Sequence, residues 1–113
     1  MRQQQIRQGD VFLVPTRTRP SAVAQRVTDR GRVILAYGEV TGHAHEVVGV
    51  DNADPVPAME LFEEPDGSRL LVVHRVSELR HEEHSAISLS AGSCYEVVRQ
   101  MEYTPEAIRT VTD

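Results

Sequence analysis

The stretch that decides the fold runs from Arg32 to Val50 and reads RVILAYGEVTGHAHEVVGV. Its first part, Arg32–Tyr37, is strongly apolar and predicts a central β-strand. The Val40–Gly42 step predicts a bend or reversal, because glycine accepts positive φ. Residues 43–50 then have the pattern of a partner strand, so the stretch predicts two neighbouring strands joined by a short reversal.

Further short strands are predicted on both sides of this stretch. They cover residues 11–14, 23–27, 87–89 and 94–98, while 76–79 is ambiguous. A second hairpin is predicted from residues 58–62 and 69–73, because Glu64-Pro65-Asp66-Gly67 places Pro and Gly where a turn favours them. This spacing predicts an all-β fold, either a small barrel or a two-sheet sandwich.

The length of 113 residues predicts a single domain over 1–113. Residues 1–8 are expected to form an N-terminal arm. At the other end, Thr104 has the chemistry of a helix cap, Pro105 suits a first helical position and Glu106 suits the first turn. These residues predict a short C-terminal helix over 105–111.

Composition excludes several classes of protein. No apolar run is long enough to span a membrane, and the N-terminus lacks the apolar stretch of a signal peptide. The single cysteine, Cys94, excludes an internal disulfide framework and predicts a reducing cytoplasm. Cys94 lies in an apolar strand pattern and is expected to be a small core residue. A net charge of −5 disfavours general binding to nucleic acid.

The charges are unevenly distributed along the chain. All twelve basic residues are Arg; seven lie in residues 1–38, whereas residues 39–66 hold eight acids and no Arg or Lys. One interpretation is a solvated acidic loop beside scattered surface Arg. The other is a homo-oligomer in which Arg2 and Arg7 of one subunit meet the acidic 51–66 loop of the next.

Four of the five histidines form two close pairs. His43 and His45 would lie on the same face of an extended strand, about 7 Å apart. His81 and His84 would be neighbours in a helical turn or a tight loop. Imidazole is a common ligand of transition metals, so the four residues predict a site for Zn, Fe, Ni or Mn. The alternative is that some of them are surface or hydrogen-bonded core histidines.

Two glutamates are candidates for acid/base chemistry beside the histidines. Glu39 would lie near His43 if the chain reverses at Gly42. Glu83, like Glu82, could orient an imidazole through its second nitrogen. Alternatively, Glu82 and Glu83 are both charged side chains that are exposed to solvent. The HEEH run is one residue too short for the His-Glu-x-x-His motif of zinc proteases.

Two resemblances follow from these motifs. Gly42-His43-Ala44-His45, followed by His81, His84 and the 87–97 segment, is similar to the cupin pattern. In cupins a His-x-His strand is completed by a Glu and a later His inside a small β-barrel. Here Gly49 and Val50 stand where that Glu is expected.

The whole chain also resembles a small bacterial and phage-borne family of uncharacterised proteins. The motifs that carry this resemblance are Arg7-Gln8-Gly9-Asp10-Val11, Gly38–His45, His81-Glu82-Glu83-His84 and Arg99–Ile108.

Two classes of function are therefore expected. The first is a metal-binding cytoplasmic protein, extending to a small cupin-like metalloenzyme that acts on a small-molecule ligand. The second is a non-enzymatic assembly or interaction module, of a phage or its host, that holds no metal.

Overall fold

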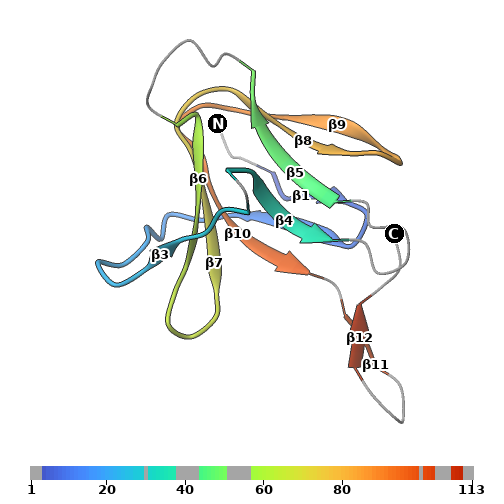
Figure 1. The fold of residues 1–113 in the computed structure, drawn as a ribbon, viewed down its shortest axis with the longest axis horizontal. Coiled ribbons are helices and arrows are strands. Elements are labelled where there is room, and N and C mark those ends of the chain that lie inside the picture. The colour runs from blue at the N-terminus through green and yellow to red at the C-terminus, as the bar shows by residue number, and fades with distance from the viewer. Residues whose placement is uncertain are drawn as a thin grey trace.

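The fold is taken from a computed structural model, which describes residues 4–29, 31–37, 44–50, 57–99, 101–103 and 108–110. Every regular element in these residues is a β-strand, and all strand pairs are antiparallel (Figure 1). The predicted all-β class is confirmed, in the form of two sheets that do not close into a barrel. No helix in the described residues could cross a membrane.

The larger sheet has six strands. In spatial order they are β1 (Ile6–Gln8), β2 (Val11–Pro15), β10 (Cys94–Arg99), β7 (Arg69–Val73), β6 (Met59–Glu63) and β3 (Gln25–Arg26). The predicted strand over 23–27 is thus reduced to the two residues of β3. The 11–14 and 94–98 predictions are confirmed within one residue at each end.

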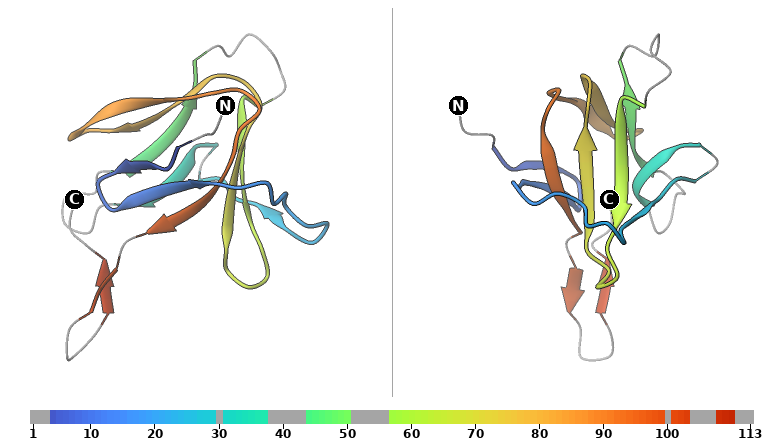
Figure 2. Two further views of the ribbon diagram at one scale, coloured as in Figure 1. Left: turned by 180° about the vertical axis from the view of Figure 1, so that it is seen from behind. Right: turned by 90° about the vertical axis from the view of Figure 1, so that its left-hand side faces the viewer.

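The smaller sheet has four strands, and a separate hairpin lies outside both sheets. The four are β4 (Val33–Tyr37), β5 (Ala44–Gly49), β8 (Ser77–His81) and β9 (His84–Leu89). The ambiguous segment 76–79 is part of β8. The hairpin joins β11 (Met101–Tyr103) to β12 (Ile108–Thr110) and projects away from the two sheets (Figures 1 and 2).

The two sheets share one aliphatic core, and the chain passes between them after β3, β5, β7 and β9. Alternation along each strand sends every second side chain inward. In β8, for example, Ser77, Leu79 and His81 are buried while Glu78 and Arg80 face outward. The central leucines, Leu13, Leu61, Leu71, Leu79 and Leu89, are all 0% exposed.

The predicted turn between β6 and β7 is confirmed. Gly67 has φ of +89° and donates its N–H to the carbonyl of Glu64, so glycine is needed here. Asp66 accepts hydrogen bonds from the hydroxyl and backbone N–H of Ser68. Those bonds lower the pKa of the Asp66 carboxyl. Phe62 and Leu70 pair across the hairpin, which sets its register.

The predicted C-terminal helix over 105–111 is not observed. Residues 108–110 form strand β12, which pairs with β11, whereas 104–107 and 111 lie outside the described residues. Ile108 and Thr110 are β-branched, which favours an extended chain. A helix of seven residues would also be marginal in water. The helix-cap and proline signals of this segment were therefore not sufficient to predict its secondary structure.

Candidate metal centre

Three histidines from two distant parts of the sequence, His45 and the pair His81 and His84, come together between the sheets. The ring centroid of His45 is 4.3 Å from that of His81 and 5.9 Å from that of His84. The rings of His81 and His84 are 4.7 Å apart. The predicted meeting of the two histidine pairs is thus observed for these three residues. His43 and Glu39 lie outside the described residues.

Strand alternation and a tight turn explain this meeting. In β5, His45 and Val47 point inward while Glu46 points toward solvent. β8 and β9 are joined by a turn at Glu82 and Glu83, with His81 paired to His84. The register shifts between Leu79 and His81, as at a β-bulge, a feature that often re-aims side chains. The tight loop predicted for this pair is a β-hairpin, not a helical turn.

Two polar residues, one from β1 and one from the turn that follows it, lie against the ring of His45. Its Nδ1 lies 2.9 Å from Oε1 of Gln8, and its Nε2 lies 3.4 Å from Oδ1 of Asp10. His45 is 0%, Asp10 1% and Gln8 3% exposed. The imidazole is therefore held between an amide oxygen and a carboxylate, away from water.

Arg99 balances the charge of the Asp10 carboxylate. Its Nε donates to Oδ2 of Asp10 at 2.9 Å, while an Nη of the same guanidinium donates to the carbonyl of Tyr37 at 2.6 Å. The residue thus links β10 to the end of β4. Oδ2 of Asp10 thus contacts Arg99, while Oδ1 of the same carboxylate faces His45.

The glutamates of the β8–β9 turn have different contacts. Glu83 donates its backbone N–H to Nδ1 of His81 at 3.0 Å, and its side chain is exposed. The carboxylate of Glu82 accepts the N–H of Ala44 at 3.3 Å, which ties the turn to β5. The backbone of Glu83 thus contacts an imidazole, and the role predicted for its carboxylate stays a prediction.

The donor atoms fit a metal ion only in part. Within the described ranges, no three His, Cys, Asp or Glu side chains are arranged to hold an ion. One pair does have suitable spacing, because ligands about 2.1 Å from an ion at a tetrahedral angle lie about 3.4 Å apart. Nε2 of His45 and Oδ1 of Asp10 have that separation.

A small cavity of about 230 Å³ borders this cluster. Its lining residues are Ala44, Glu46, Arg80, His81 and Glu82. His81 is 8% exposed, so its edge of the cluster is the one nearest to solvent. Among the described residues that line the cavity, His81 is the member of the histidine cluster that reaches it.

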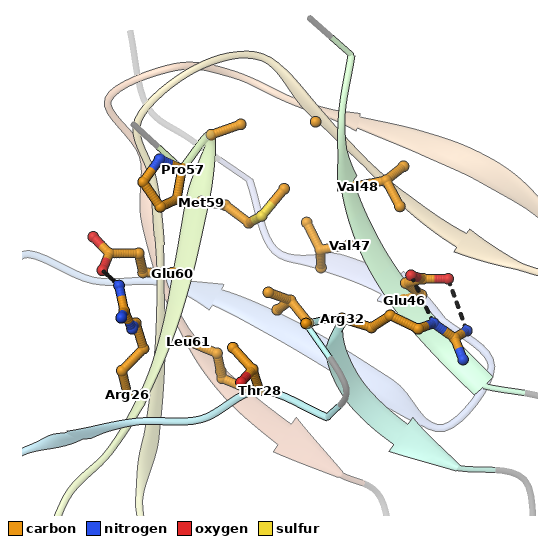
Figure 3. Close-up of a pocket in the computed structure, with 14 residues that line it drawn as sticks. Arg26, Thr28, Arg32, Glu46, Val47, Val48, Pro57, Met59, Glu60 and Leu61 are labelled. Carbon is orange, nitrogen blue, oxygen red and sulfur yellow. Dashed lines mark hydrogen bonds and ion pairs between the residues drawn. The ribbon is translucent and has the colours of Figure 1, made fainter. Parts of the chain in front are cut away.

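A separate cavity of about 460 Å³ opens between the sheets at β5 and β6 (Figure 3). Val47, Met59 and Leu61 line it, and two ion pairs stand on opposite sides. Arg32 binds both carboxylate oxygens of Glu46, and this hydrogen bonding raises the pKa of Arg32. Arg26 binds Glu60. The described residues that line the cavity include no histidine, and their two acids are paired, so the histidine cluster is the better candidate for chemistry.

Sequence reasoning missed Gln8, Asp10 and Arg99 as parts of the site. Gly9-Asp10 has the composition of a turn before a strand, which is also its position in the structure. The signal that could have identified Gln8 and Asp10 was two polar residues next to the apolar run of β2. Their partner was not predictable, because Gln8 and His45 are 37 positions apart.

Cys94 is a buried thiol, as predicted, at 3% exposure with Sγ 3.4 Å from the carbonyl of Thr18. Burial raises the pKa of the thiol above 9.0. We expect labelling by a disulfide reagent at neutral pH to be roughly tenfold or more slower than in the urea-unfolded chain. Equal rates in the two states would contradict the burial.

The same thiol predicts a loss of stability at high pH. The unfolded thiol ionises near pH 9.0, whereas the folded thiol stays protonated to higher pH. The contribution of Cys94 to the free energy of unfolding is therefore intact below pH 9.0 and falls as the pH rises past it. Cys94→Ala, measured by urea unfolding in parallel, should remove this part of the pH dependence.

Comparison with protein-family models found a match over residues 7–100, to a domain of unknown function, DUF8820. All of the cluster described above lies inside the matched range, whereas β11 and β12 lie beyond it. No curated protein and no solved structure matched the chain. The resemblance to cupins stays a prediction, and the expectation of an uncharacterised family is confirmed. The chain belongs to the DUF8820 family.

Proposed function

We propose that this protein binds a divalent transition metal ion through Nε2 of His45 and Oδ1 of Asp10. His84 and His81 would complete the site, together with His43, which the sequence pattern places on the same strand face as His45. A cytoplasmic location fits the single reduced thiol.

The observation that carries the proposal is the facing pair of His45 and Asp10. Nδ1 of His45 is engaged by the amide oxygen of Gln8, which leaves Nε2 opposite a carboxylate oxygen at 3.4 Å. An ion between these two atoms would accept a lone pair from each of them. The separation suits two ligands of one tetrahedral ion.

The surroundings of Asp10 support the same proposal. A metal-binding carboxylate is usually hydrogen-bonded through its other oxygen. Arg99 supplies that bond at Oδ2. Donation from the guanidinium also offsets part of the cost of burying this carboxylate, which is 1% exposed.

Burial of the donors favours a structural role for the ion over a catalytic one. His45 and Asp10 are closed to solvent and His81 is nearly so. A structural site stabilises the fold directly, whereas a catalytic site keeps a position open for water or substrate. An imidazole and carboxylate donor set suits Zn, Fe, Ni or Mn.

The test is metal content and titration of protein purified without a histidine tag. We expect an equimolar ion, or its uptake on titration, and thermal stability that rises with metal concentration. An ion at 100 times its dissociation constant adds about 2.7 kcal/mol to the free energy of unfolding.

His45→Asn provides the sharpest variant, because asparagine retains an N–H near the position of Nδ1 and lacks Nε2. This variant should lose saturable binding. His74→Ala is the matched control, since His74 is 40% exposed and bound to Glu60 outside the cluster. Wild-type protein that takes up no transition metal would overturn the proposal, as would equal loss of binding in the two variants.

The assembly function is a second candidate, favoured by the β11–β12 hairpin. An isolated two-stranded hairpin is marginally stable in water, and this one projects from the body. Arg7, expected to contact a second subunit, lies over the ring of Phe12 and donates to the carbonyl of Gly9 within its own chain. If His45→Asn had a different molecular mass in solution from the wild type, and neither protein bound metal, this result would favour assembly over metal binding.

A further inference from the structure

Gln8 makes three side-chain hydrogen bonds inside the protein. Its Nε2 donates to the carbonyl of Leu79 at 3.1 Å and to the carbonyl of Ser85 at 3.0 Å. Its Oε1 lies 2.9 Å from Nδ1 of His45. With 3% exposure, this amide from β1 connects three strands of the other sheet, β5, β8 and β9.

The two carbonyls determine the orientation of the amide. A backbone carbonyl only accepts hydrogen bonds, so both must face the NH₂ group of Gln8. Rotating the amide by half a turn would place its oxygen against two other oxygens. The oxygen of Gln8 is therefore the atom that faces His45.

This orientation determines which nitrogen of His45 carries hydrogen. An amide oxygen is an acceptor, so Nδ1 of His45 must be the donor. We propose that Gln8 is a positioning residue, which keeps His45 protonated at Nδ1 and leaves Nε2 as the position that faces Asp10 and takes the ion. The effect that Gln8 would have on metal binding rests on the proposed function.

His81 shows that this arrangement is specific to His45. Nδ1 of His81 accepts the backbone N–H of Glu83, so hydrogen on a neutral His81 ring resides on Nε2. The neutral rings of His45 and His81, which are tilted by 32° to each other, thus differ in their tautomer. Through its Nε2, a neutral His45 of this tautomer would offer a lone pair, whereas a neutral His81 would first have to release its bond to Glu83.

Outer partners of a metal-binding histidine fix its tautomer and ring orientation, and their loss typically costs about 10- to 100-fold in affinity. The same loss is expected for Gln8→Met, which has a similar shape but neither an amide oxygen nor an NH₂ group. No ligand atom is removed by this change.

The experiment reads the tautomer directly, by ¹⁵N NMR of the histidine rings in chelator-treated protein. In the wild type, Nδ1 of His45 should carry hydrogen, whether or not Nε2 also does. In Gln8→Met, hydrogen should redistribute between the two nitrogens. The ring of His74, which contacts Glu60 outside the cluster, should be unchanged and serves as the internal control.

Metal titration of the same two proteins completes the test. A lone pair on Nδ1 of wild-type His45 would overturn the inference, and this result needs no variant. An unchanged tautomer together with unchanged affinity in Gln8→Met would also overturn it. If the tautomer is as proposed and shifts in Gln8→Met, but wild-type protein takes up no ion, the proposed function fails while the assignment of Gln8 stands.

Discussion

Asp10→Ala is expected to lower the free energy of unfolding by about 2–4 kcal/mol. Removing one partner of a buried charge pair leaves the other uncompensated, at a typical cost of about 3–5 kcal/mol. The Asp10 carboxylate is 1% exposed, but the side chain of Arg99 is 33% exposed and recovers part of its hydration. The expected cost is therefore below the fully buried case. Urea unfolding followed by circular dichroism measures it.

Two further variants separate the effect of the Asp10 charge from the effect of its hydrogen bonds. Asp10→Asn can still accept from Arg99 and can donate toward Nε2 of His45, so it should cost less than Asp10→Ala while also losing metal uptake. Glu78→Ala breaks an exposed pair with Arg80 and should stay within about 0.5 kcal/mol of the wild type. An Asp10→Ala protein as stable as Glu78→Ala would show that the buried pair contributes nothing net.

The strand framework could be predicted because its signals are local. Apolar runs, alternation and turn residues identified β2, β4, β5, β6, β7 and β10 near their observed bounds. The turn at Gly67 needed no knowledge of the rest of the chain, because positive φ at that position selects glycine. The C-terminal segment had equally local signals, but nothing in the sequence showed that 108–110 would pair with 101–103.

The candidate site was only partly predictable. Spacing identified the two histidine pairs, and alternation predicted that His45 would share a face with other residues of its strand. Spacing did not predict which strand of the opposite sheet would lie against that face. β1 supplies Gln8, and the turn that follows it supplies Asp10. Such contacts between sheets depend on how the two sheets pack as a whole, and no local sequence pattern predicts them.

Leu79 joins the hydrophobic core to the histidine cluster. Its side chain is 0% exposed at the centre of β8, and its carbonyl accepts from Gln8. Leu79→Ala should lower the free energy of unfolding by about 3 kcal/mol, within the usual range of about 2–5 kcal/mol, because the vacated volume cannot be fully refilled. Val76→Ala is the control, since Val76 is 47% exposed and should change stability by about 0.5 kcal/mol or less.

Stability and site geometry should separate in the Leu79→Ala variant. The hydrogen bond from Gln8 goes to the backbone of residue 79, which the substitution retains. The folded fraction of Leu79→Ala should therefore keep hydrogen on Nδ1 of His45, although the protein unfolds at lower urea concentration. If the tautomer were lost together with stability, the orientation of Gln8 would depend on the packing of β8, and not on the two carbonyls alone.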